Sequence, residues 1–250
     1  MNEIRVSIIL PVYNGALYLA HQLDSIIPML AKNDEIVISY DQSTDDTLKI
    51  VKEYELKNSR ISVFINNGER GVWQNSINAL NHARGKYILP CDQDDEWINN
   101  KINIMVSALE NSGAVVATHD GYVCDANLNI IPPSIFDRCN TNGSLVRNFL
   151  KNSVSGCCLA YRSEIKGIFS NTPFTPDASD QWAALGAIVI GKLEIVHDKL
   201  IKHRIHDSNY TPKRKRKMRT ILWGRFLLTC NLVWLLFHRK EYQISCGSKC

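Results

Sequence analysis

Four carboxylates stand within five positions of the sequence, in the segment "DQDDE" from Asp92 to Glu96. They follow the apolar run "YIL", residues 87–89, which predicts a short strand. Carboxylates this close repel one another unless a positive charge lies among them. Mg²⁺ and Mn²⁺ prefer oxygen ligands and usually bind one or two carboxylates together with phosphates and water. The spacing therefore predicts a divalent-metal site at Asp94, with Asp92 as a further candidate ligand.

The last two acids of this segment also have a purely structural interpretation. Acidic side chains are favourable in the first turn of a helix, near its positive end. We therefore expect Asp95 and Glu96 to begin a helix. Because an Asp-x-Asp pair occurs by chance in many chains, its interpretation depends on the elements around it.

Strand-like and helix-like patterns alternate through the first hundred residues. Short apolar runs predict strands at residues 6–10, 35–39, 61–65 and 87–89. Helical spacing predicts helices over 19–30 and 74–83, and Ser43 and Thr44 are expected to cap a further helix with Asp45 and Asp46 in its first turn. Further along, we expect a strand at 114–118 and a helix at 181–190. This alternation predicts an α/β fold with a mostly parallel central sheet and right-handed crossovers.

A polar cluster follows each of the first four predicted strands: "PVYNG", "DQSTDD", "NNGERG" and "CDQDDEW". Ligands of parallel sheets bind beyond the carboxyl ends of the strands, so these clusters should converge on one crevice. No GxGxxG follows the first strand and no GxxxxGK is present, which argues against a dinucleotide site and a P-loop.

Composition restricts the class of protein further. The length of 250 residues fits one large domain, or one domain with an appendage. The net charge of +4 is concentrated in "KRKRKMR", residues 213–219, rather than spread along a face with aromatic residues, so no nucleic-acid partner is expected. The first residues do not have a signal-peptide layout, and the eight cysteines then indicate reduced thiols and a cytoplasmic setting.

The order of these motifs resembles glycosyltransferase family 2, whose members have the GT-A fold. The segments that carry the resemblance are "SIILPVYNG", "SYDQSTDDT", "NNGERGVWQNSINALNHARGKYI" and "CDQDDEW". Together with "GVWQN", the Gln and Trp of "DQDDEW" resemble bacterial surface-polysaccharide transferases, rhamnosyltransferases among them. The resemblance spans about residues 4–210. It implies a GT-A domain over 1–210, with a nucleotide-sugar half (1–110) and an acceptor-side half (111–210), followed by a tail over 211–250.

The resemblance also implies roles for individual residues. Donor-binding roles fall on Pro11, Val12, Tyr13, Asp41, Arg70, Asn75, Asp92 and Arg204. Asp94 and His206 would hold Mg²⁺ or Mn²⁺. Where the family often has two aspartates before Gly-Ser, this chain has "YDQS" and keeps only the second, Asp41. His203 replaces the family's usual Tyr and is expected to pack rather than to take part in chemistry.

The segment "SDQWAALGA" resembles the family's catalytic element and implies that Asp180 is the general base. Asp177 is the competing carboxylate, and the structural alternative is that Asp180 only caps the helix that follows. The implied reaction is inverting transfer of a sugar from dTDP-rhamnose or a UDP-hexose. The implied acceptor is a hydroxyl of a lipid-linked saccharide in O-antigen or capsule synthesis. A metal-dependent nucleotidyl- or phosphotransferase and a non-catalytic, membrane-recruited binding module are the alternatives.

The tail contains the apolar segment "ILWGRFLLTCNLVWLLF", residues 221–237. As a helix it would extend about 25 Å, short of the ~30 Å hydrocarbon core of a bilayer. Basic residues flank both ends, and Trp223 and Trp234 suit a membrane interface. We favour a helix that lies on the anionic inner face of the cell membrane, which would make the protein cytoplasmic and peripheral. Packing on the domain or a partner and spanning the bilayer are the other interpretations.

Overall fold

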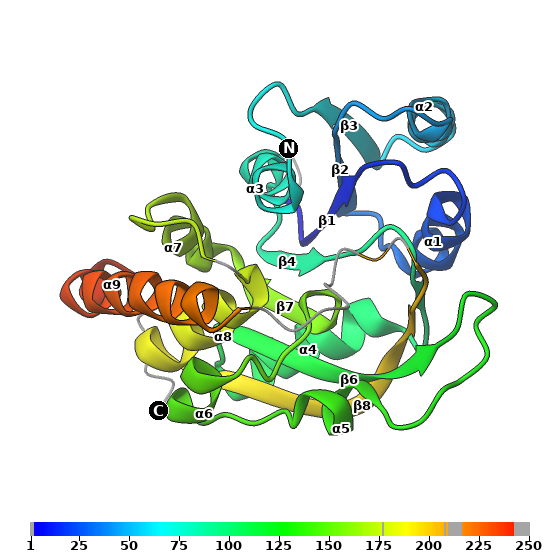
Figure 1. The fold of residues 1–250 in the computed structure, drawn as a ribbon. Coiled ribbons are helices and arrows are strands. Elements are labelled where there is room, and N and C mark those ends of the chain that lie inside the picture. The colour runs from blue at the N-terminus through cyan, green and yellow to red at the C-terminus, as the bar shows by residue number, and fades with distance from the viewer. Residues whose placement is uncertain (1–2, 177, 208, 210–216, 243–250) are drawn as a thin grey trace.

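A mixed eight-stranded sheet forms the centre of the molecule (Figure 1). The structure is a computed structural model, and it describes residues 3–176, 178–207, 209 and 217–242. The strand order is β3-β2-β1-β4-β7-β6-β8-β5. The strands are β1 (Val6–Val12), β2 (Asp34–Tyr40), β3 (Ile61–Ile65), β4 (Tyr87–Pro90), β5 (Glu96–Trp97), β6 (Val116–Cys124), β7 (Leu159–Arg162) and β8 (Leu193–Arg204).

Helices cover both faces of this sheet. They are α1 (Leu19–Ile26), α2 (Thr47–Lys57), α3 (Val72–His82), α4 (Lys101–Ser112), α5 (Ile135–Cys139), α6 (Leu145–Leu150), α7 (Lys166–Ser170), α8 (Ser179–Ile190) and α9 (Met218–Tyr242). Along β1, Ile8 and Leu10 pack with α1, α2 and α4, whereas Ile9 packs with α3, α7 and α8. This alternation follows from the period of two in a strand, and it explains why β1 is apolar on both faces.

The parallel part of the sheet confirms the strands predicted in the first hundred residues. β1 pairs in parallel with β2 and β4, and β2 pairs in parallel with β3. The second half departs from this pattern because β7 runs antiparallel to both β4 and β6, and β5 runs antiparallel to β8. The carboxyl ends of β1 to β4 therefore meet at one edge, as the sequence predicted.

Two predicted helix starts are wrong. α2 begins at Thr47 with Asp46 as its N-cap, because Ser43 and Thr44 instead bond to the loop after β1. Asp95 and Glu96 do not begin a helix. Glu96 belongs to β5, which pairs with β8, and α4 begins only at Lys101.

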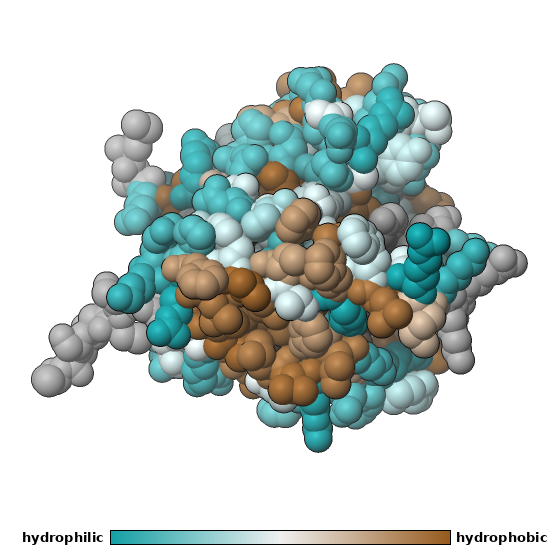
Figure 2. All heavy atoms as spheres, turned by 60° about the vertical axis from the view of Figure 1, so that its left-hand side comes forward, coloured by the Kyte–Doolittle hydropathy of each residue, from teal (hydrophilic) through white to brown (hydrophobic). Residues whose placement is uncertain are grey.

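The C-terminal helix α9 is 25 residues long, longer than the apolar segment recognised in the sequence, and by length and composition it could cross a membrane. One side of it packs against the domain through Leu228, Asn231 and Leu235, and the Asn231 side chain bonds to the main chain of Phe174. The opposite side of α9 is exposed and forms part of the apolar surface that Figure 2 shows.

Candidate active site

The acid motif after β4 is tied to the loop after β1. The Gln93 side chain accepts a hydrogen bond from the Tyr13 amide at 3.0 Å and donates one to the Tyr13 carbonyl at 2.9 Å. Gly15 leaves room for this side chain, because a Cβ there would lie 2.3 Å from Gln93 Oε1. The Gln between the two aspartates therefore joins the ends of the neighbouring strands β1 and β4, and the Tyr13 side chain is half exposed.

Asp94 contacts two residues that lie far from it in the sequence. Its Oδ2 lies 2.8 Å from Nε2 of His206 and accepts a hydrogen bond from the Asn209 side chain at 3.2 Å. The Asp94 carbonyl accepts a hydrogen bond from the guanidinium of Arg204 at 2.7 Å. The buried Arg204 lies over the ring of Tyr18, so the end of β8 is fixed against the acid motif. The structure thus brings together the two predicted metal ligands.

Asp95, the next residue, points to a different set of partners. Its Oδ1 lies 2.9 Å from Nδ1 of His203 and accepts a hydrogen bond from the Arg204 amide at 3.0 Å. The same His203 nitrogen lies 3.8 Å from Sγ of Cys157. His203 therefore contacts two ionisable groups, whereas the sequence led us to expect that it only packs.

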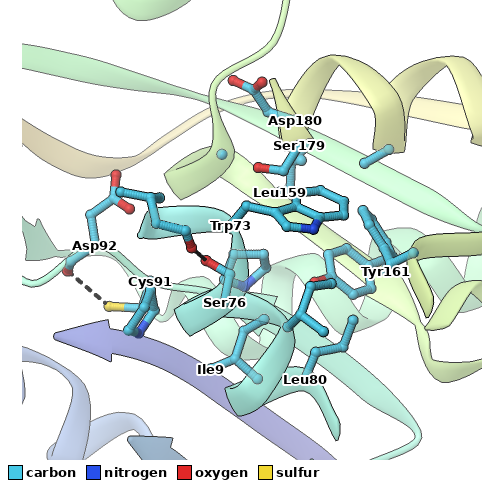
Figure 3. A pocket seen from close by; sticks show the side chains of 17 residues that line it. Ile9, Trp73, Ser76, Leu80, Cys91, Asp92, Leu159, Tyr161, Ser179 and Asp180 are labelled. Atoms are coloured by element: carbon cyan, nitrogen blue, oxygen red, sulfur yellow. Dashed lines mark hydrogen bonds between the residues drawn. The ribbon is translucent and has the colours of Figure 1, made fainter. Parts of the chain in front are cut away.

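Asp92 and Asp180 border one cavity of about 90 Å³ (Figure 3). Asp92 lies on the loop after β4 and is exposed, whereas Asp180 lies in the first turn of α8 and accepts a hydrogen bond from the Gln181 amide at 2.7 Å. Much of the remaining wall is apolar and includes Trp73 of α3 and Tyr161 of β7. Two carboxylates thus border a largely apolar cavity that could hold part of a small molecule.

Burial and mutual repulsion raise the proton affinity of the carboxylates at this site. Burial raises the pKa of Asp92, Asp94 and Asp95 above the ordinary value, and in each case a neighbouring negative group adds to the shift. Asp92 borders the cavity and is exposed there. Burial also raises the pKa of Asp180, although its hydrogen bond with Asn152 acts in the opposite direction. A carboxylate with a raised pKa is a stronger base towards a substrate hydroxyl.

A divalent ion fits the residues at Asp94. The site combines a carboxylate oxygen, an imidazole nitrogen and an amide side chain, and three carboxylates crowd together with raised pKa values. Oxygen-rich sites of this kind suit Mg²⁺ and Mn²⁺. Adding a positive charge would relieve the repulsion among the acids.

The other predicted donor-binding residues occupy different environments. Pro11 borders the cavity, and Val12 beside it is fully buried. Asp41 is buried, and its two oxygens accept hydrogen bonds from the Asn66 side chain and the Gly71 amide.

Asn75 and Arg70 lie on and just before α3. Asn75 is buried. Its side chain donates a hydrogen bond to the Val12 carbonyl at 3.2 Å and accepts one from the Ser39 hydroxyl, so it links α3 to β1 and β2. Arg70 is exposed and donates to the Gln42 side chain at 2.5 Å.

Asp95, Cys157 and His203 come together although no motif in the sequence predicts it. Their donor atoms and that of Asp92 lie within 4.8 Å of one another. The sequence feature that could have indicated these contacts is the pair of histidines in "HRIH". His203 contacts Asp95, and His206 contacts Asp94. Asp177 lies outside the described residues.

Comparisons with known proteins agree with this architecture. The structure superposes on S. aureus TarS 1-349 in complex with UDP-GlcNAc with a TM-score of 0.67 at 19% identity, over 96% of this chain and 70% of that one. The mannosyltransferase PcManGT from Pyrobaculum calidifontis, in complex with GDP-Man and Mn²⁺, superposes with a TM-score of 0.61 at 16% identity, over 95% of this chain and 73% of that one. The fold is therefore GT-A, as expected.

The sequence comparison defines the family. The profile of Glycosyl transferase family 2 matches residues 7–169, more than half of the chain, and the protein belongs to this family. A relative in Escherichia coli, the UDP-Glc:alpha-D-GlcNAc-diphosphoundecaprenol beta-1,3-glucosyltransferase WfgD, is 28% identical over 148 residues. That match covers 59% of this chain and 57% of WfgD, so it extends over little more than half the length of the relative.

Proposed function

We propose that the protein is an inverting, metal-dependent glycosyltransferase that moves a hexose or rhamnose from a nucleotide-diphospho-sugar to a lipid-linked saccharide. The observation that carries the proposal is the arrangement of two groups around one sheet edge: the Asp94–His206 pair, and the cavity shared by Asp92 and Asp180. The name of WfgD, which specifies UDP-Glc and a diphosphoundecaprenol-linked acceptor, supports a UDP-hexose donor and this class of acceptor.

The donor is proposed to lie across the carboxyl ends of β1 to β4. The buried carboxylate of Asp41 would accept hydrogen bonds from the base, and Pro11, Val12 and Tyr13 would line the nucleotide pocket. Asp92 would contact the ribose or the sugar at the mouth of the cavity. In this arrangement residues 1–110 hold most of the donor, and residues 111–210 form the acceptor side apart from Arg204 and His206, which lie beside the donor diphosphate.

Asp94 and His206 are proposed to hold Mg²⁺ or Mn²⁺, and PcManGT, with the same fold, carries Mn²⁺ with its donor. When bound, the ion would neutralise negative charge on the departing nucleoside diphosphate, an effect worth several kcal/mol. The contact of Arg204 with the Asp94 carbonyl keeps a second positive charge close to this position.

Asp180 is proposed to accept the proton of the acceptor hydroxyl. Its raised pKa and its place on the cavity wall suit a general base, a role that typically contributes ~10² to 10⁴ in rate. The hydroxyl oxygen would then attack the anomeric carbon from the face opposite the diphosphate, with inversion. The apolar wall around Trp73 and Tyr161 would limit water in the cavity and so limit hydrolysis of the donor.

The membrane surface is proposed as a further partner. The exposed side of α9 carries Leu222, Trp223 and Phe226, and Val146 and Leu150 of α6 are exposed as well. The two helices are joined by a hydrogen bond from Arg225 to the Leu150 carbonyl at 3.0 Å. A helix held on the domain in this way would lie on the inner face of the membrane rather than span it, close to a lipid-linked acceptor.

The decisive experiment offers the full chain labelled UDP-glucose or dTDP-rhamnose, Mn²⁺ and a GlcNAc-diphosphate-lipid acceptor, and measures label in the extracted lipid. Label in the lipid, with an anomeric configuration opposite to that of the donor by NMR, supports the proposal. Release of labelled sugar 1-phosphate without lipid labelling would instead indicate nucleotidyl transfer, because attack at the α-phosphorus leaves the sugar on the β-phosphate.

A further inference from the structure

Four side chains with metal-binding atoms meet beside the acid motif: Asp92, Asp95, Cys157 and His203. One donor atom from each lies within 4.8 Å of the other three. They come from the loop after β4, the 3-10 turn Gly156–Cys158 and strand β8. Unlike the Asp94–His206 pair, this cluster contains a thiol, that of Cys157.

We propose that the cluster of Asp92, Asp95, Cys157 and His203 is a second metal site, selective for a thiophilic divalent ion such as Zn²⁺. Thiolate and imidazole ligands favour Zn²⁺, whereas carboxylate, carbonyl and water ligands suit Mg²⁺ and Mn²⁺. One sulfur, one nitrogen and two carboxylate oxygens supply the four ligands of a tetrahedral zinc ion.

Two separations within the cluster are already close to those of a zinc site. Nδ1 of His203 lies 3.8 Å from Sγ of Cys157 and 2.9 Å from Oδ1 of Asp95. Bond lengths of about 2.0–2.3 Å in a tetrahedron separate the ligand atoms by about 3.3–3.8 Å. Small side-chain adjustments would therefore complete the geometry. Sγ of Cys157 and Nδ1 of His203 must both be free of a proton to bind the ion, so binding would release the thiol proton to solvent.

One buried atom of the cluster lacks a hydrogen-bond partner. Asp95 is fully buried, yet its Oδ2 accepts no hydrogen bond from any residue that the structure describes. A buried carboxylate oxygen without a partner is costly, and a cation would satisfy it. Cys157 is buried as well, whereas Asp92 is exposed and opens the cluster to the cavity, which gives an ion a path inward.

The charges around the cluster would balance with one divalent ion. Two carboxylates and one thiolate contribute three negative charges. The fully buried Lys101 donates a hydrogen bond to the Cys157 carbonyl at 2.5 Å and interacts electrostatically with Cys157 and Asp95. Its single positive charge and a Zn²⁺ ion together supply the three positive charges that a site at this depth requires.

An ion in this cluster would hold Asp92, which borders the same cavity as Asp180. Zn²⁺ is therefore expected to inhibit sugar transfer, and Mg²⁺ or Mn²⁺ in excess would not reverse the inhibition while the thiolate is bound. This consequence rests on the proposed transferase activity, whereas binding of the ion does not.

The test uses Co²⁺ as a spectroscopic substitute for Zn²⁺ on the reduced, metal-free full chain, without nucleotide. Thiolate-bound Co²⁺ gives an intense sulfur-to-metal charge-transfer band in the near ultraviolet, which oxygen and nitrogen ligands alone do not. We expect this band at one equivalent of Co²⁺, its loss on adding Zn²⁺, and its absence in Cys157→Ser. The adjacent buried Cys158→Ser is the matched control and should keep the band, as should Asp94→Asn.

Absence of the band in the unaltered protein, or its persistence in Cys157→Ser, would overturn the proposal. If Cys157→Ser does not fold by circular dichroism, His203→Gln provides the second variant, and Zn²⁺ affinity measured by competition with a chelating dye should fall at least about tenfold. An unchanged Zn²⁺ affinity in His203→Gln would contradict the assignment. A failed sugar-transfer assay would leave this result intact, since the band requires no substrate.

Discussion

Nε2 of His206 lies 2.8 Å from Oδ2 of Asp94, although 112 residues separate the two in the sequence. The contact joins the end of β4 to the end of β8, which belong to the parallel and the mixed half of the sheet. Asn209 donates to the same carboxylate oxygen, and its own side-chain oxygen accepts a hydrogen bond from the His206 amide. The two proposed metal ligands are therefore held next to each other by contacts within the protein.

The first prediction concerns this pair. Asp94→Asn and His206→Ala should each raise the Mn²⁺ concentration needed for half-maximal transfer at least about tenfold, because each removes one ligand. A chelator should abolish transfer, and added Mn²⁺ should restore it. The measurement is a titration of transfer rate against free Mn²⁺. The matched controls are Asp198→Asn and His197→Ala, exposed residues of β8 that should leave the titration unchanged. Equal activity with and without chelator would refute the metal role.

The second prediction concerns the proposed base. Asp180→Asn should lower the transfer rate by ~10² to 10⁴, because an amide cannot accept the proton. Nucleotide affinity by calorimetry should stay within a few-fold, since Asp180 is proposed to serve the acceptor. Asp177→Asn is the control and should retain activity. Loss of transfer in Asp177→Asn alone would move the base to that position, and a large loss of nucleotide affinity in Asp180→Asn would assign Asp180 to the donor.

Local patterns predicted the parallel half of the sheet well. The strand at 61–65 was placed correctly, and β1, β2 and β4 each extend the predicted range by a few residues. β1 and β2 are buried on both faces, so their central apolar runs Ile8–Leu10 and Ile36–Ile38 could be recognised without knowledge of distant partners. Parallel order then placed the polar loops at one edge, which is why Asp92 and Asp41 could be assigned to the same crevice.

The errors arise where a distant residue decides the local structure. Asp95 and Glu96 have the composition of a helix start, but Asp95 bonds to His203, 108 residues away, and Glu96 pairs with β8. Ser43 satisfies the amide of Asn14, 29 residues earlier, so it does not cap α2. Nothing in the spacing of the cysteines indicated that Cys157 would meet His203, since only the fold brings the 3-10 turn Gly156–Cys158 next to the end of β8.

The third prediction concerns stability and pH. Glu35 of β2 is buried and accepts hydrogen bonds from Ser7 of β1 and from Arg84 in the loop after α3. Burial alone would raise the pKa of Glu35, but the hydrogen bonds from Arg84 and Ser7 lower it below the ordinary value of 4.5. Because the folded state then binds the proton less tightly than the unfolded state, this stabilisation is fully present above pH 4.5 and is lost as the pH falls through the folded-state pKa.

Glu35→Gln should accordingly lower the free energy of unfolding by about 1–3 kcal/mol at pH 7. The difference from the unaltered protein should shrink at acidic pH, where the native Glu35 is itself protonated. Urea unfolding at the two pH values measures both quantities. Glu53→Gln, which removes an exposed ion pair with Lys57, is the control and should change stability by less than about 1 kcal/mol. A pH-independent loss in Glu35→Gln would show that shape, rather than charge, matters at this position.

The fourth prediction concerns the exposed apolar side of α9. Trp223 and Phe226 are 61% and 55% exposed and stack on each other with ring centroids 5.4 Å apart. The double substitution Trp223→Ser and Phe226→Ser should weaken binding to anionic vesicles at least about tenfold in a co-sedimentation assay, since each aromatic contributes ~1–2 kcal/mol on partial burial. The fold should persist, because the packing contacts of α9 lie on its other side. The control is Leu17→Ser with Leu56→Ser, which removes two even more exposed apolar residues near α1 and on α2, on the far side of the sheet (Figure 1). This double variant should leave vesicle binding unchanged. Equal sedimentation of both double variants would show that the exposed side of α9 does not contact the membrane. A change of oligomeric state in the α9 variant alone would show that this side binds a second copy of the chain.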